Sequence, residues 1–251
     1  MKRLLIFLAV LLLLSGGVWW WLPFRQRGII PPAMAAAVPA DCRQVILVLA
    51  DHLDQVPAKV WLLERAGNRS PWRAAAGPLE ANVGRNGVGW GLGEPVLPNP
   101  GVFPDKREGD GRSPAGIFTL PWAFGTRPAA EAAGVKLPWR ECTDTLRGVD
   151  DVNSRYYNRI VDEAAIPDKD WDSAEIMRRP DGLYDEGIAI GHNPANRPGG
   201  GSCIFLHIWS GPGKGTAGCT ALSRENVHKI LQWTDPAKFP RLILDVKKSE
   251  E

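Results

Sequence analysis

Short apolar runs, separated by turns rich in glycine and proline, recur along most of this chain. With 27 Gly and 22 Pro in 251 residues, long helices are disfavoured, which favours a fold built of strands and loops over a helical bundle. Arg43–Ala50 (RQVILVLA) is apolar and rich in β-branched residues, which is typical of a buried strand. Further strands are predicted over residues 59–65, 79–84, 116–120, 187–191, 203–209 and 241–246.

Helical patterning is clearest near the end of the sequence. Residues 223–233 (SRENVHKILQW) begin with Ser223, a residue type that caps helices, and place Val227, Ile230 and Leu231 on one face. We therefore predict an amphipathic helix there, packed against the sheet.

The stretch of residues 121–186 has weak periodicity, and we interpret it as a long insertion of loops and partial helix. Within it, residues 171–179 predict a short helix capped by Asp172 or Ser173. The whole pattern predicts a mainly β domain with a few short helices and an inserted loop-helix region.

An apolar segment precedes this domain. Leu4–Leu22 is a 19-residue stretch without a charged side chain, within a predicted signal peptide or transmembrane anchor over residues 1–24. A cleaved signal peptide would place its small residues at Ser15 and Gly17. An uncleaved anchor would place the tryptophans at 19–21 in the membrane interface, and this triplet favours the anchor. Under both interpretations, the residues after this segment are exported to the cell envelope or periplasm. An uncleaved segment would also anchor them in the inner membrane.

A Pro- and Ala-rich linker is predicted over residues 25–40, which include the run PPAMAAAVPA, so the folded domain is expected to span 41–251. The net charge of +2 resides entirely before this domain. Without a basic surplus in the folded part, no nucleic-acid partner is expected. The basic residues of the first 40 positions, which include no acidic residue, are Lys2, Arg3, Arg25 and Arg27.

Four cysteines, at 42, 142, 203 and 219, allow three complete pairings, and the sequence does not choose among them. In an oxidising compartment disulfides persist. If one cysteine is a reactive thiol, a bond between Cys203 and either Cys142 or Cys42 is a hypothesis.

Residues 199–222 (GGGSCIFLHIWSGPGKGTAGCTAL) carry the clearest chemical signal. His207 lies near the end of a predicted strand, and Cys219 follows it by twelve residues, across a Gly-rich loop. An imidazole beside a thiol can take the thiol proton and so create a sulfur nucleophile. Gly218 permits close approach of the backbone, so amide N–H groups near Cys219 are expected to form an oxyanion hole.

This segment resembles the catalytic motif of the L,D-transpeptidase (YkuD-like) family, in which a strand histidine precedes a Gly-Cys element. Residues 83–87 (VGRNG) and 113–118 (SPAGIF) are similar to two further motifs of that family, and the resemblance extends over about residues 41–247. It implies a β-sandwich or barrel, with Cys219 as the nucleophile, His207 as the general base, and the carbonyl of Ile208 holding the imidazole tautomer.

The resemblance also implies an activity: acyl transfer between peptidoglycan stem peptides in cell-wall assembly, without a cofactor. Where the family usually has a histidine and an arginine near the cysteine, this chain has Ala217 and Ala221. Hydrolysis of the same peptides, by an L,D-carboxypeptidase or amidase, therefore stays an alternative, as does an inactive wall-binding protein. We expect His192, Thr216 and Trp209 to contact substrate, although His192 could equally be a structural loop residue.

A zinc site is the main chemical rival. His192, Cys203, His207 and Cys219 are all residue types that bind zinc. Their spacing matches no closed zinc pattern, and along one regular strand Cys203 and His207 would lie about 13 Å apart. No bound metal is therefore expected.

Overall fold

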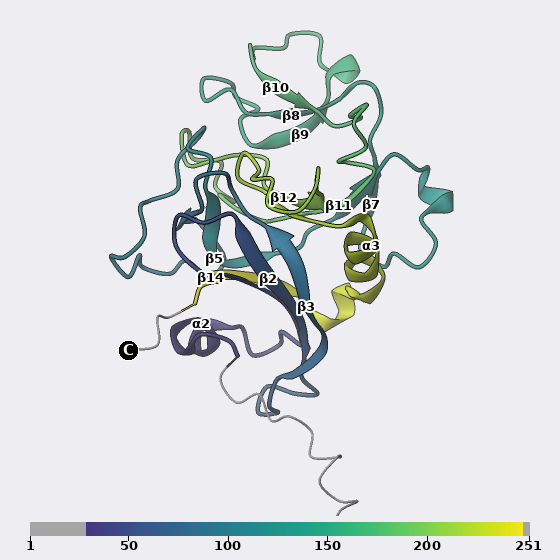
Figure 1. Ribbon diagram of the computed structural model, residues 1–251. Helices are drawn as coiled ribbons and strands as arrows, with labels where there is room; N and C mark the ends of the chain where they lie inside the picture. Colours follow the sequence, from purple (N-terminus) through teal and green to yellow (C-terminus); the bar gives the residue numbers. More distant parts are fainter. Residues whose placement is uncertain (1–28, 248–251) are drawn as a thin grey trace, which may run out of the picture.

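The computed structural model describes residues 29–247 (Figure 1). The fold is mainly β, with two α-helices, α2 (Pro32–Ala37) and α3 (Arg224–Trp233), in the described part. Short 3-10 turns occupy Ala129–Glu131, Glu163–Ala165 and Pro236–Lys238. The strands are β1 (Gln44–Ala50), β2 (Pro57–Glu64), β3 (Arg73–Asn82), β4 (Val88–Trp90), β5 (Ser113–Thr119), β6 (Ala123–Gly125), β7 (Trp139–Glu141), β8 (Leu146–Val149), β9 (Arg159–Asp162), β10 (Ala174–Ile176), β11 (Glu186–Ala189), β12 (Phe205–Ile208), β13 (Thr220–Leu222) and β14 (Arg241–Val246).

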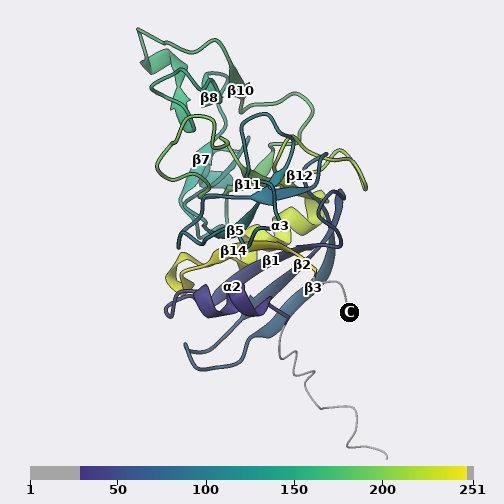
Figure 2. The same ribbon diagram turned by 90° about the vertical axis from the view of Figure 1, so that its left-hand side faces the viewer.

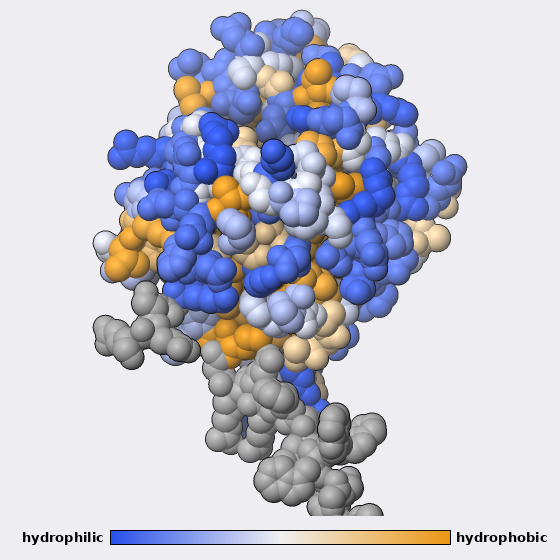
Figure 3. All heavy atoms as spheres, in the orientation of Figure 1, coloured by the Kyte–Doolittle hydropathy of each residue, from blue (hydrophilic) through white to orange (hydrophobic). Residues whose placement is uncertain are grey.

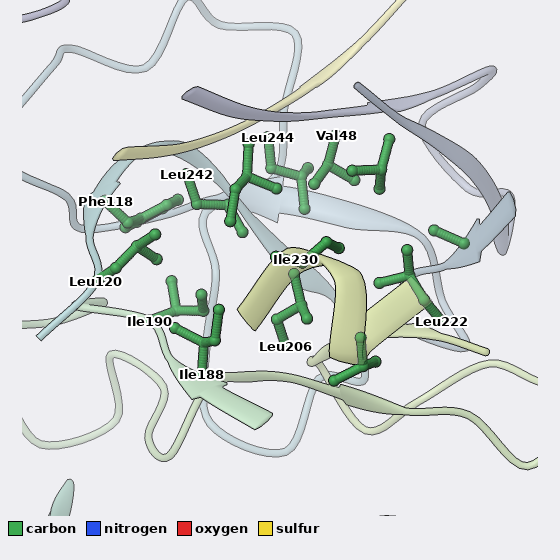
Figure 4. Packing of buried hydrophobic residues seen from close by; sticks show 14 of the residues in the cluster. Val48, Phe118, Leu120, Ile188, Ile190, Leu206, Leu222, Ile230, Leu242 and Leu244 are labelled. Atoms are coloured by element: carbon green, nitrogen blue, oxygen red, sulfur yellow. The ribbon is translucent and has the colours of Figure 1, made fainter. Parts of the chain in front are cut away.

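Most strands belong to one 11-stranded sheet, in the order β4-β5-β14-β1-β2-β3-β13-β12-β11-β6-β7. This sheet folds over so that its two parts face each other across the main core, with α3 packed between them (Figures 1 and 4). Side chains from the two parts meet there, including Val48, Leu242 and Leu244 from one part and Ile188 and Leu206 from the other, with Ile230 of α3 between them. The predicted mainly β class is therefore confirmed.

The predicted strands are found as β1, β2, β3, β5, β11, β12 and β14, and residues 241–246 form a strand with the predicted limits. The predicted amphipathic helix is found as α3. Ser223 Oγ accepts a hydrogen bond from Asn226 N at 3.3 Å, and Val227, Ile230 and Leu231 are buried. These elements formed as expected because their signals are local.

The linker prediction for residues 25–40 is wrong over the part that the structure describes. Residues 32–37 form α2, with proline at its first turn, where the missing N–H costs nothing. Ile30, Met34 and Val38 are buried against the face of β1 that points away from the main core. Every residue of β1 is buried, because one face meets α2 and the other meets the main core. The folded domain thus begins before residue 41.

The helix predicted over residues 171–179 is also wrong. β10 lies there instead and pairs antiparallel with β8, which pairs antiparallel with β9. This three-stranded sheet sits above β11 and β12 at the top of Figure 1, and Figure 2 shows it at the same end after a 90° turn. Strand alternation explains the result, since Ile176 is 52% exposed whereas Met177 is fully buried.

The insertion predicted over residues 121–186 contributes more strand than helix. Besides the small sheet, it supplies β6 and β7, which extend the large sheet beyond β11. The described surface is largely hydrophilic in the view of Figure 3, with hydrophobic residues scattered over it and a group of them at its lower end.

The predicted signal peptide or anchor of residues 1–24, and residues 25–28 of the linker, lie outside the described residues. Within residues 29–247, the helices are too short to span a bilayer.

Candidate active site

Cys219 and His207 line one pocket of about 200 Å³. β12 and β13 are parallel neighbours, and their register places His207 opposite Ala221. Cys219 directly precedes β13 and lies two residues before Ala221, so the alternation of side chains puts it on the same face as His207. The two residues that the sequence nominated as nucleophile and base are thus diagonal neighbours on adjacent strands.

The backbone of Cys219 is held by two hydroxyl groups. Its carbonyl oxygen accepts hydrogen bonds from Ser113 Oγ at 2.9 Å and from Thr216 Oγ1 at 2.6 Å. Ser113 Oγ in turn accepts a hydrogen bond from Gly84 N at 2.9 Å. Three motifs that are distant in sequence, around residues 84, 113 and 219, therefore meet at one carbonyl group.

Two glycines allow this meeting. Gly218 has a φ of +156°, a backbone conformation that residues other than glycine rarely adopt. A Cβ atom at Gly84 would lie 2.2 Å from Gly111 O, so only glycine fits there. The N–H of Gly218 donates to Thr216 Oγ1 at 3.1 Å, so in this conformation the expected oxyanion donor is already engaged.

His207 is buried, and its Nδ1 lies 2.7 Å from Ile208 O. We assign the ring proton to Nδ1, because a carbonyl oxygen can only accept. This leaves Nε2 as a proton acceptor, and the contact that the resemblance implies for Ile208 is present. Burial lowers the pKa of His207 to about 4, so the ring is neutral at pH 7 and has the form that a general base requires.

Cys219 Sγ accepts a hydrogen bond from Phe205 N at 3.3 Å and lies 3.7 Å from Cys203 O. Burial, with a further contribution from the negative charge of Glu175, raises the pKa of Cys219 to about 12. The residue is therefore a thiol at neutral pH, and activation requires a base rather than a standing thiolate. In the described structure the sulfur is not hydrogen-bonded to His207, a contact that often tightens only when substrate binds.

Sequence reasoning missed three side chains that line the same pocket: Glu175, Arg179 and Tyr184. Tyr184 donates from its hydroxyl to Glu175 Oε2 at 2.7 Å and packs edge-on against the ring of His207, with centroids 5.0 Å apart. Arg179 lies over the Tyr184 ring, 5.2 Å from its centroid, and forms an ion pair with Asp181. The sequence carries no clear signal for these three residues, because residues 175–177 are Glu, Ile and Met and do not alternate in polarity.

Thr216 and Trp209 line the pocket as expected, but His192 does not. His192 Nδ1 accepts a hydrogen bond from Leu92 N at 3.3 Å, and its Nε2 donates to Gly200 O at 2.9 Å. Both ring nitrogens are thus used to join two loops, beside a different hollow. The structure supports the alternative that His192 is a structural loop residue.

All four cysteines are free and buried, so the hypothesised disulfide involving Cys203 is not formed. Cys42 packs against β1, whereas Cys142, Cys203 and Cys219 share a separate cluster with Phe205. Cys203 has a φ of +51° and precedes β12, so the regular strand geometry assumed for it does not apply. Among residues 29–247, His, Cys, Asp and Glu side chains form no group suited to a metal ion.

Two larger hollows carry no comparable chemistry. One, of about 740 Å³, is lined by residues of β2, β3 and the segment 237–239. The other, of about 920 Å³, lies beside α2 and is lined by apolar residues such as Trp90 and Phe103. Neither is lined by a cysteine, so we place the candidate active site at the smaller pocket.

The pocket combines a neutral imidazole with an available Nε2, a thiol on a fixed backbone, and a carboxyl group nearby. These groups are suited to proton transfer from the thiol and nucleophilic attack by the sulfur.

Comparison of the chain with protein-family models, with curated proteins and with solved structures finds no match.

Proposed function

We propose that this chain is an L,D-transpeptidase-like cysteine acyltransferase that acts on peptidoglycan stem peptides in cell-wall assembly. The observation that carries the proposal is the convergence of three motifs on Cys219, whose carbonyl is held by Ser113 and Thr216 while its thiol shares a pocket with His207. A large sheet folded over on itself is compatible with the β-sandwich or barrel expected for such an enzyme.

The proposed reaction has two steps. First, His207 Nε2 takes the thiol proton as Cys219 Sγ attacks a peptide carbonyl carbon. The C–N bond then breaks, the imidazolium gives its proton to the departing amine, and a thioester remains on Cys219. Next, an acceptor amine attacks the thioester, the C–S bond breaks, and the thiol regains a proton. The product is a new amide bond, and no cofactor is consumed.

The proposed location is the cell envelope or periplasm, reached through residues 4–22 as a signal peptide or an inner-membrane anchor. A role in cell-wall organisation and cell shape would follow from crosslinking in that compartment. The partners proposed are therefore the stem peptides and, through the N-terminal segment, the membrane.

Intact mass spectrometry tests the nucleophile. The wild-type protein should gain the mass of one acyl group when incubated with a carbapenem or a purified stem peptide, and peptide mapping should place it on Cys219. Cys219→Ala should show no gain, whereas Cys142→Ala, a matched change of a buried thiol outside the pocket, should behave like the wild type. A wild type that is never acylated would favour a catalytically inactive wall-binding protein.

Hydrolysis of the same peptides is the second candidate, because Ala217 and Ala221 stand where the family usually has polar side chains near the cysteine. Water would then replace the acceptor amine in the second step. Chromatography of the products from stem peptides distinguishes the two: dimers indicate transfer, and free tripeptide without dimer contradicts it.

A further inference from the structure

The wall of the candidate active site includes a carboxyl group supplied by the small sheet. Glu175 lies on β10, between Ala174 and the exposed Ile176, and lines the pocket together with Cys219 and His207. Tyr184 donates to one of its oxygens, Oε2, at 2.7 Å. The other oxygen, Oε1, accepts no hydrogen bond within the described structure, so it is available to a ligand in the pocket.

The charges around Glu175 do not neutralise it directly. Arg179 lines the same pocket, but its guanidinium pairs with Asp181. Burial raises the pKa of Glu175, and the negative charge of this carboxyl is the second cause, after burial, that raises the pKa of Cys219. In the free protein Glu175 therefore works against a thiolate at residue 219.

This opposition ends once Cys219 is acylated, because a thioester carries no titratable proton. A carboxylate in a confined pocket then favours a cation close to the thioester carbonyl. The acceptor of the proposed second step is an amine, which is an ammonium ion at neutral pH and must lose a proton before its nitrogen can attack.

We propose that Glu175, held in place by Tyr184, binds the ammonium group of the acceptor and takes its proton as the nitrogen attacks the Cys219 thioester. This inference rests on the proposed function and assigns the acceptor's charge recognition to one side chain. The substrate class is a primary amine on a side chain or free terminus, small enough at its end to enter a pocket of about 200 Å³.

The proton and electron balance is as follows. The carboxylate of Glu175 removes one proton from the ammonium, and the freed nitrogen lone pair forms the C–N bond. The C–S bond breaks and its electron pair stays on sulfur. The second proton lost by the nitrogen passes through His207 to that sulfur, and Glu175 later releases its proton to water. No oxidant, reductant or co-reactant is required.

Single-turnover kinetics of Glu175→Gln test the proposal, because the substitution keeps the size of the side chain and its acceptance from Tyr184. Acylation of Cys219 by a carbapenem or stem peptide should stay within about twofold of the wild type, or become faster as the opposing charge is lost. Transfer to an amine acceptor should fall by about tenfold to a hundredfold, with a raised KM for the acceptor, as expected for loss of a hydrogen bond to a charged group. Hydrolysis should then dominate the products.

Hydroxylamine as the acceptor separates loss of charge recognition from a general disturbance of the fold. It is largely uncharged at neutral pH, so its attack on the thioester should be the same in Glu175→Gln and the wild type. Glu131→Gln, an exposed carboxyl of the same insertion outside the pocket, serves as the matched control. Tyr184→Phe should reduce transfer to amines in the same sense but less severely.

The outcomes separate the two proposals. Normal acylation of Glu175→Gln with unchanged transfer to amines would overturn the inference and leave the proposed function standing. An equal loss with amines and hydroxylamine would also overturn it, because the residue would then act through the fold. Absence of acylation at Cys219 in the wild type would instead overturn the proposed function, and the inference with it.

Discussion

Ser113 donates a hydrogen bond from its hydroxyl to the carbonyl oxygen of Cys219 at 2.9 Å, although 106 positions separate the two residues. Ser113 is fully buried and also accepts from Gly84 N, so one hydroxyl group joins three segments of the chain. The position of the proposed nucleophile thus depends on β5, a strand that does not neighbour β13 in the sheet.

Ser113→Ala should slow acylation of Cys219 by about tenfold and lower the free energy of unfolding by about 1–3 kcal/mol, because Gly84 N and Cys219 O each lose a buried partner. Stopped-flow acylation and urea denaturation measure the two effects. Ser173→Ala, a change of an exposed serine, is the control and should alter neither. Wild-type acylation by the Ser113 variant would show that Thr216 alone positions the cysteine.

Alkylation of Cys219 by iodoacetamide at pH 8 should be about a thousandfold slower than that of a free cysteine, since burial raises the thiol pKa from 9.0 to about 12 and only the thiolate reacts. The alkylation rate of Cys219 should continue to rise above pH 9, because its thiolate fraction still increases there. Mass spectrometry after timed quenching gives the rate for each cysteine, and denatured protein provides the reference. Rapid alkylation at pH 8 would indicate a thiolate–imidazolium pair rather than the neutral pair described above.

Acid should destabilise the fold through its buried histidines. Burial lowers the pKa of both His192 and His207 from 6.5 to about 4. Between these values the unfolded chain binds protons that the folded chain does not, so stability is greatest above pH 6.5 and decreases as the pH falls towards 4. Each buried histidine should lower the free energy of unfolding by up to about 3 kcal/mol as the pH falls from 6.5 to 4.

Urea denaturation at pH 7.5 and pH 4.5 checks this dependence. Carboxyl groups also titrate at low pH, so the informative quantity is the difference between the wild type and His192→Asn. The variant should start less stable at pH 7.5 and lose less stability on acidification. Equal losses in both proteins would contradict the assignment of a neutral, buried His192.

Met34→Ala should destabilise the domain by about 2–4 kcal/mol, because the Met34 side chain is only 2% exposed and packs beneath β1. Ala35→Lys, on the exposed side of the same helix, should change the free energy of unfolding by less than about 0.5 kcal/mol. Both are measured by urea denaturation. A negligible effect of Met34→Ala would restore the view that residues 25–40 are only a linker.

Features with a local sequence signal could be predicted. The apolar run of residues 241–246 forms β14 with the predicted limits, and Ser223 caps α3 through its own side chain. The pairing of His207 with Cys219 at one pocket followed from two strand-like segments joined by a Gly-rich loop.

Features that depend on distant contacts could not be predicted. α2 has prolines at its start and little polarity, and it is stabilised by burial of Met34 against β1 rather than by its own pattern. Glu175 lies on β10, which is placed by its pairing with β8, and strands of three and four residues are too short to show a period. Tyr184 lies between β10 and β11 and contacts Glu175 through a hydrogen bond from its hydroxyl. Two side chains that line the pocket beside Cys219 and His207 therefore come from residues 121–186, where the sequence pattern is weakest.

β14 lies between β5 and β1, so within the large sheet residues 241–246 alone connect β4 and β5 to the remaining strands. A ribosome makes every other described strand before this one. Until β14 is released and inserted, the segment carrying Ser113 has no place in the sheet from which to reach the cysteine. The hydrogen bond from Ser113 to the Cys219 carbonyl is therefore expected to form only after synthesis has passed residue 246.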